Sequence, residues 1–94
     1  MEKLPSNIKY IVGIRTLVER TLWENHPFAR PDDTKHFKAG TVLQQVEVTS
    51  LEEAKRKEAE MHWQYAGGRR HCLVHGRYLF ELYRDQFDIF IEKV

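Results

Sequence analysis

The sequence predicts an α+β fold of two layers, in which a mostly antiparallel four-stranded sheet carries two helices on one face. Three observations lead to this class. Two segments place apolar residues at helical spacing, four short segments have the character of strands, and turn residues separate the last three strands. The expected order of elements is therefore α-β-α-β-β-β, with helices packed against one side of the sheet.

The chain has the size and composition of a single domain, spanning residues 1–94. It contains 41% hydrophobic residues, enough to build one core in a chain of this length. Lys and Arg number 15 against 14 Asp and Glu, so the chain lacks the overall positive field of a dedicated nucleic-acid binder. A single cysteine, Cys72, and the absence of a long uncharged apolar run predict a cytoplasmic protein that does not insert into a membrane.

The first predicted element is an amphipathic helix over residues 7–24. Its apolar residues recur mostly three and four positions apart, with charged residues between them. Residues 28–40 follow as a long loop between this helix and the sheet, because they contain proline and clustered polar residues without a period. The apolar positions of the helix are Ile8, Ile11, Val12, Ile14, Leu17, Val18 and Leu22.

The middle of the chain predicts a strand over residues 41–49, followed at once by a second helix. Val42, Val46 and Val48 alternate with more polar neighbours, as in a half-buried strand. Ser50 and Glu53 have the spacing of a capping box, which begins a helix by satisfying free backbone N–H groups. Gly67 suits the left-handed position at which helices end.

The C-terminal third predicts three strands, at 69–74, 77–83 and 87–94, with turns at His75-Gly76 and Asp85-Gln86. With two-residue turns, His71 faces Phe80, Phe80 faces Ile91 and Leu82 faces Ile89. One face of the sheet then forms the core, and the other stands open to water. The predicted core face holds Phe80, Leu82, Phe87, Ile89 and Ile91, and the predicted open face holds Leu79, Glu81, Tyr83, Asp88, Phe90 and Glu92.

Two helices cannot cover both sides of the sheet, so one face is expected to stay open. This open face is the predicted functional surface. Monomers rarely expose large apolar patches, and aromatic residues are enriched where proteins dock. The predicted partner-binding residues are the rings Tyr83 and Phe90 with the acidic Glu81, Asp88 and Glu92 around them. The strand 87–94 is also expected to be a sheet edge open to strand addition. In the alternative reading, the loop at 28–40 folds over these rings.

These residues predict a small non-enzymatic protein–protein interaction module, an adaptor or an inhibitor of the kind that phages and mobile elements encode. The expected partner is a larger protein, such as an enzyme with a basic surface, or a second copy of the chain in a homodimer. The acidic residues around the rings favour a basic partner.

A nucleic-acid-binding domain is the alternative function. Arg69, Arg70 and Arg77 lie in the only basic stretch that is free of acidic residues, and Tyr78 is available for stacking on a base. The stretch is short and the net charge is only +1, so nucleic acid is the less favoured partner.

An enzyme of unknown class is the third reading, and no cofactor or metal is predicted. His71, Cys72 and His75 are ligand types that zinc prefers, but in a strand Cys72 points away from both histidines, and four ligands at a recognisable spacing are missing. Two common signals of catalysis are missing from the sequence. It has no pair of carboxylates in an apolar setting and no glycine-rich phosphate loop.

Overall fold

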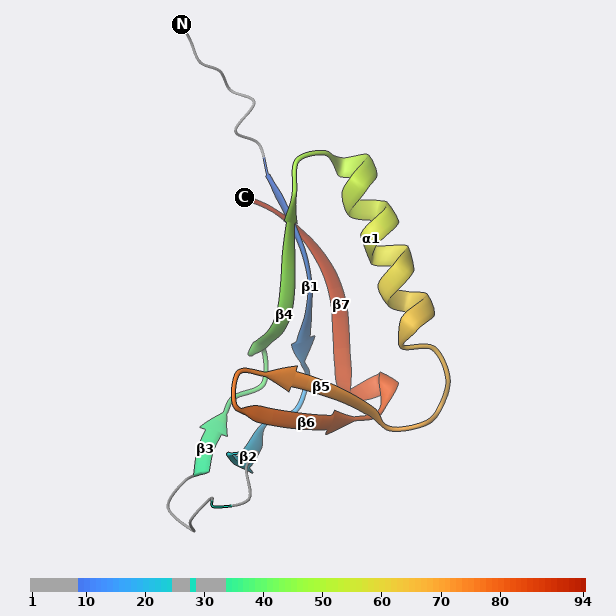
Figure 1. Cartoon of the computed structure of the whole chain (residues 1–94). Coiled ribbons are helices and arrows are strands. Elements are labelled where there is room, and N and C mark those ends of the chain that lie inside the picture. Colours follow the sequence, from blue (N-terminus) through green and yellow to red (C-terminus); the bar gives the residue numbers. More distant parts are fainter. Residues whose placement is uncertain (1–8, 25–27, 29–33) are drawn as a thin grey trace, which may run out of the picture.

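The computed structural model describes residues 9–24, 28 and 34–94. In this part of the chain, one α-helix accompanies seven strands, which form three small antiparallel sheets (Figure 1). The elements in chain order are β1 (Tyr10–Thr16), β2 (Arg20–Trp23), β3 (Thr34–Phe37), β4 (Val42–Val48), α1 (Leu51–Gln64), β5 (His71–His75), β6 (Tyr78–Leu82), the 3₁₀ turn η2 (Arg84–Gln86) and β7 (Phe87–Lys93).

The largest sheet, sheet A, has the strand order β4-β1-β7, so the first strand of the chain lies between the fourth and the last. Both pairings are antiparallel; the one with β7 runs along the whole of β1, and the one with β4 runs from Tyr10 to Arg15. Leu43 is an extra residue of β4 opposite the step from Ile14 to Arg15, which makes a β-bulge there. The other two sheets are the hairpins β2–β3 and β5–β6.

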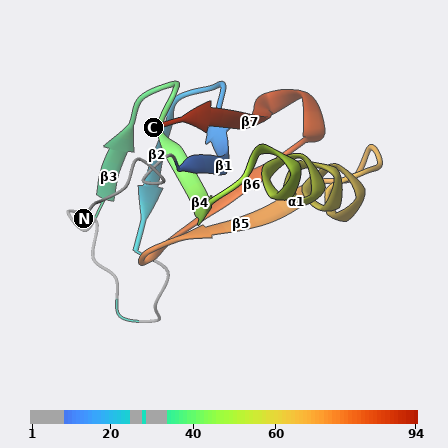
Figure 2. The same ribbon diagram turned by 90° about the horizontal axis from the view of Figure 1, so that it is seen from above.

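Helix α1 begins where the sequence predicts it. The backbone N–H of Glu53 donates to the Ser50 hydroxyl at 3.1 Å, which is one half of the expected capping box. The helix ends at Gln64, and Gly67 has a φ of 101°, the left-handed conformation that glycine adopts without steric cost. Viewed from above, α1 lies against one face of sheet A, where Ala54 packs with Val12 and Val48 (Figure 2).

A second and larger core cluster lies where the β5–β6 hairpin meets the lower part of sheet A. Phe80 and Leu82 of the hairpin are fully buried, and Phe87 and Ile89 of β7 are buried against them. Their predicted place in the core is confirmed, while Ile91 is half-buried beside α1. Two clusters therefore fill one side of the molecule, the smaller under α1 and the larger under the hairpin.

The prediction of two helices on a four-stranded sheet is wrong, because residues 10–16 and 20–23 are strands β1 and β2. Residues 7 and 8 of the predicted helix lie outside the described residues. The segment is rich in β-branched Ile, Val and Thr, which favour strands, and β1 is the central strand of sheet A. A central strand that is buried on both faces shows a nearly continuous apolar run, which can be mistaken for a helix.

The predicted meander of the last three strands is also wrong beyond its first hairpin. β5 and β6 do pair, but the turn is Gly76-Arg77, so His71 faces Leu82 and Leu73 faces Phe80. β6 does not pair with β7, which instead pairs with β1. The 3₁₀ turn η2 replaces the expected tight turn at Asp85-Gln86, and the Gln86 side chain accepts a hydrogen bond from the Tyr83 N–H at 2.9 Å.

The predicted loop at 28–40 contains a strand. β3 pairs with β2 in an antiparallel hairpin, and Phe37 of β3 is buried in the larger core cluster. Residues 29–33 of this predicted loop lie outside the described residues.

Candidate functional site

Sheet A has a helix-covered face and an open face, defined by the strand register. The helix-covered face includes Val12, Val48 and Ile91, which pack with α1. Residues of the opposite parity point the other way, because side chains alternate along a strand. The open face comprises Ile11, Gly13, Arg15, Gln45, Glu47, Asp88, Phe90 and Glu92.

Phe90 is buried on the open face, although α1 does not cover it. Only 7% of the residue is exposed, because its ring lies over Gly13, its direct partner on β1. The Arg15 guanidinium carbon lies 4.1 Å from the centre of the ring, and Arg15 Nε is 3.3 Å from a carboxylate oxygen of Asp88. The ring therefore has a glycine beneath it and a paired guanidinium above it, and it does not stand open to water as the sequence predicted.

The five predicted partner-binding residues occupy three separate places. Asp88, Phe90 and Glu92 share the open face of sheet A. Tyr83 is 48% exposed before η2, where it lines a hollow with Gly68 and residues 84–86. Glu81 is on the outer face of the β5–β6 hairpin, 3.5 Å from Arg70. They do not form one patch, because β6 and β7 belong to different sheets.

The outer edge of β7 carries backbone groups that no described strand pairs with, since β7 ends sheet A. Leu17 N–H donates to Gln86 O at 2.8 Å, and Val94 N–H donates to Lys9 O at 2.9 Å. These two bonds show which residues of β7 direct their backbone groups toward β1. Hydrogen-bonded and free positions alternate in an antiparallel pair. The N–H and C=O groups of Ile89, Ile91 and Lys93 therefore point outward, away from β1.

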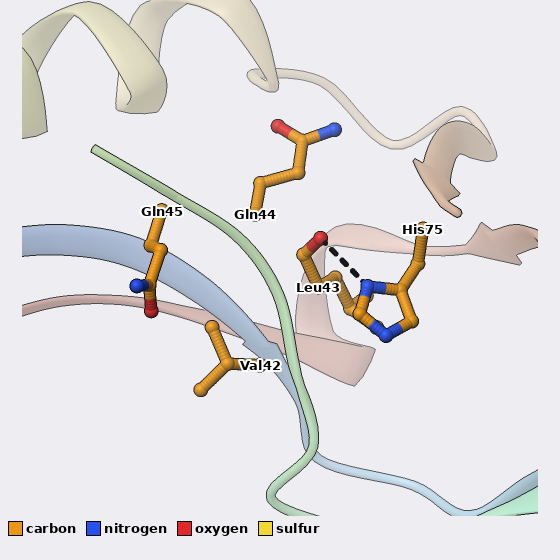
Figure 3. A pocket seen from close by; sticks show the side chains of 5 residues that line it. All are labelled: Val42, Leu43, Gln44, Gln45 and His75. Carbon is orange, nitrogen blue, oxygen red and sulfur yellow. Dashed lines mark hydrogen bonds between the residues drawn. The ribbon is translucent and has the colours of Figure 1, made fainter.

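The outer edge of β4 is the second free edge of sheet A, but part of it is occupied. Gln44, Val46 and Val48 turn their backbone groups toward β1, so those of Gln45 and Glu47 point outward. At Leu43 the carbonyl oxygen is 3.1 Å from Nδ1 of His75, a residue of β5. A hollow lies at this place, lined by Val42, Leu43, Gln44, Gln45 and His75 (Figure 3).

The arginines of the alternative nucleic-acid site are largely matched by carboxylates. Arg70 lies 3.5 Å from Glu81, and Arg77 lies 3.1 Å from Glu24. Tyr78 is half-buried and packs in a T-shaped arrangement with Phe37, with ring centres 5.1 Å apart. The structure therefore leaves Arg69 as the one arginine of this stretch without an ion pair among the described residues.

Cys72 points to the opposite face of β5 from His71 and His75, because side chains alternate along a strand. Cys72 is exposed, whereas His71 is buried at 4% exposure between the rings of Tyr65 and Phe87. Nε2 of His71 has no hydrogen-bond partner in the described part of the chain. Throughout residues 9–24, 28 and 34–94, no three His, Cys, Asp or Glu side chains come together as a metal site would require.

Comparison with family models, with curated proteins and with solved structures finds no match to this chain. Of the helical segments that the structure describes, none has both the length and the apolar character needed to cross a lipid bilayer. The free edges and the open face of sheet A are therefore the candidate site.

One feature of the sequence could have indicated the central strand. Gly13 interrupts a run of β-branched and aromatic residues, and a glycine inside a strand often marks a close approach of another group. The contact of His75 with Leu43 has no comparable signal, because 32 residues separate them and neither belongs to a motif.

Proposed function

We propose that the chain is a non-enzymatic protein–protein interaction module that binds a partner by strand addition at the outer edge of β7. One observation carries the proposal: Ile89, Ile91 and Lys93 direct their N–H and C=O groups outward from the last strand of sheet A. An extended segment of a partner can pair with such an edge and gain main-chain hydrogen bonds. Figure 2 shows β7 at the border of the sheet, on the side away from the β5–β6 hairpin.

The side chains beside this edge favour a partner strand of alternating basic and apolar residues. On the open face, Glu92 is exposed and has no ion pair among the described residues, while Asp88 is already paired with Arg15. On the helix-covered face, the half-buried Ile91 offers an apolar contact. A basic side chain opposite Glu92 and an apolar one opposite Ile91 would satisfy both faces, because cross-strand neighbours interact directly.

The same acidic residues weigh against self-pairing of β7 around Phe90. In a symmetric antiparallel pair of two copies centred on Phe90, Asp88 of each copy would lie opposite Glu92 of the other. Like charges placed directly opposite destabilise a strand pair. A basic partner is therefore favoured over a homodimer in this register.

An adaptor or inhibitor acting in the cytoplasm is the cellular role we propose for such a module. Cys72 is the single cysteine of the sequence and is exposed, which fits a reducing compartment better than an oxidising one. An enzyme with a basic surface remains the kind of partner that the exposed Glu92 fits best.

Amide hydrogen exchange tests the proposal with a blocked peptide in which Lys alternates with Val. When the peptide adds to the edge, the amides of Ile91 and Lys93 should exchange at least about tenfold more slowly, because they become hydrogen-bonded. The amides of Phe90 and Glu92 already donate toward β1 and should not change. A peptide of alternating Glu and Val is the control for charge.

A proline variant separates the contribution of the backbone N–H at the edge from that of the side chain. Lys93→Pro removes an outward N–H and leaves the ladder to β1 intact, whereas Lys93→Ala removes the same side chain and keeps the N–H. We expect Lys93→Pro to abolish peptide binding and Lys93→Ala to retain it. Unchanged exchange at Ile91 and Lys93 with the Lys/Val peptide, or equal binding by the two variants, would overturn the proposal.

A further inference from the structure

A hollow of about 270 Å³ lies at the outer edge of β4, on the opposite border of sheet A from β7. Val42 and Leu43 contribute aliphatic wall, and Gln44 and Gln45 extend to the two sides of the strand (Figure 3). His75 reaches the hollow from β5. The hollow is thus built from a sheet edge and one imidazole from another sheet.

The His75 ring is held in one orientation and one tautomer. It packs in T-shaped arrangements with the rings of Phe37 and Phe80, whose centres are 5.8 and 6.3 Å away. A carbonyl oxygen only accepts hydrogen bonds, so Nδ1 of His75 donates to Leu43 O at 3.1 Å and must carry the hydrogen. In the neutral ring Nε2 therefore keeps its lone pair and acts as an acceptor.

This acceptor is unused by the described residues. None of them donates to Nε2 of His75, and Figure 3 shows that nitrogen on the side of the ring away from the Leu43 carbonyl. His75 lines the hollow together with Val42 and Leu43, so a ligand there meets aliphatic wall and an imidazole that has one unused acceptor. An aromatic ring that carries a single O–H or N–H donor, as in tyrosine or tryptophan, matches both features.

The free backbone groups next to the hollow indicate how such a ring would be delivered. Gln45 and Glu47 point their N–H and C=O groups outward, so an extended chain can pair with them. The bond from His75 occupies the Leu43 carbonyl, which would otherwise continue the edge. A strand added to β4 must therefore end its pairing beside His75, at the hollow.

We propose that this edge is a second recognition site, which binds an extended segment of a protein partner through the backbone of Gln45 and Glu47. A tyrosine or tryptophan side chain of that segment occupies the hollow and donates a hydrogen bond to Nε2 of His75. The site is separate from the β7 edge and does not depend on it. With both edges in use, one chain joins two extended segments across sheet A.

A double-mutant cycle tests the hydrogen bond. The probes are a blocked peptide of alternating Thr and Val with one central Tyr, and the same peptide with Phe. The wild-type chain should bind the Tyr peptide about fivefold more tightly, the effect of one neutral hydrogen bond. His75→Asn should abolish this preference, because the Asn side-chain N–H₂ takes the place of Nδ1 toward Leu43 and nothing replaces Nε2.

The backbone part of the site is tested with Gln45→Pro and its matched control Gln45→Ala. The proline removes an outward N–H and spares the bonds between β4 and β1, so the Tyr peptide should bind Gln45→Ala and not Gln45→Pro. The Lys/Val peptide at β7 should bind both variants equally. Thermal unfolding of each variant identifies any that fails to fold.

Two results would overturn this proposal. One is equal affinity of the wild-type chain for the Tyr and Phe peptides. The other is unchanged exchange of the Gln45 and Glu47 amides at a saturating concentration of the Tyr peptide. If His75→Asn does not fold, the wild-type comparison of the two peptides together with the Gln45 pair still decides the question.

Discussion

On the helix-covered face of sheet A, water is excluded by α1, whereas on the open face it is excluded by the side chains of the sheet itself. Under α1, Val12 and Val48 pack with Ala54 as in any two-layer domain. Across the sheet, the Phe90 ring lies on Gly13 and Arg15 lies on the ring, so a large aromatic residue is buried there without a second layer from the described part of the chain. Such a pairing of an aromatic side chain with a strand glycine also pins the register of β1 against β7.

The contrast shows that a sheet face without a covering helix does not have to expose apolar surface that would bind a partner. The one ring of the open face, Phe90, is screened locally, and the exposed groups of this face are charged or amide side chains such as Glu92, Glu47 and Gln45. The free binding capacity of sheet A lies instead at its two edges, in the backbone of β7 and β4. Stability measurements can separate the two faces.

The largest effect is expected at Gly13, on which the open face depends. A Cβ at this position would lie 2.7 Å from the Gln44 carbonyl oxygen and 2.8 Å from the Phe90 ring, so Gly13→Val should destabilise the fold by about 3 kcal/mol. Gly68→Val is the control, since nothing lies within 4 Å of a Cβ there. Denaturant unfolding measures both, and equal small losses would contradict the close packing of Phe90 on Gly13.

Phe90→Ala should have the next largest effect, about 2 to 3 kcal/mol, because it removes a ring that is only 7% exposed and leaves a gap over Gly13. Tyr83→Ala is the matched control, since that ring is half exposed and should cost less than about 1 kcal/mol. A small loss for Phe90→Ala in denaturant unfolding would mean that the ring is not a core residue.

On the other side of the sheet, His71→Leu should stabilise the protein by about 1 kcal/mol. The substitution removes the buried Nε2 that has no partner among the described residues and keeps an apolar group among the rings. His75→Leu should have the opposite sign, because it leaves the Leu43 carbonyl without its donor. A rise in the melting temperature for both variants, or a fall for both, would contradict this assignment.

The smallest effect is expected for the ion pair above Phe90. Both side chains are about half exposed, so Asp88→Asn should reduce stability by about 0.5 kcal/mol, and less in high salt. Arg15→Lys keeps the charge and loses the planar group over the ring, which separates the ion pair from the cation–π contact. A loss for Asp88→Asn that does not depend on salt would point to a role beyond charge pairing.

Much of the C-terminal two thirds of the chain was predictable, because its signals are local. Ser50 and Glu53 mark the start of α1, and the glycine at position 76 marks the turn between β5 and β6. The set of core residues was also largely predictable. Of the candidate site, Asp88, Phe90 and Glu92 do share a face, since side-chain alternation needs no knowledge of the partner strand.

The rest depended on contacts between distant parts of the chain. Whether residues 10–16 are a helix or a strand is decided by β4 and β7, which lie far away in the sequence and supply the ladders on both sides. The burial of Phe90 likewise depends on Gly13, more than seventy residues earlier. The one local trace of these contacts is Gly13, a glycine inside a run of β-branched and aromatic residues, and it does not say which strand or ring approaches.

By itself, the sequence determined the position of α1, the strand character of β4, β5 and β6, and the place of Phe80, Leu82, Phe87 and Ile89 in the core. Caps, turns and alternation act over a few residues, so composition and spacing are enough to specify them. The tertiary structure alone decided which strands meet and therefore which edges stay free. Strands that are distant in the chain could pair in many registers. The register that forms is the one that buries both faces of β1.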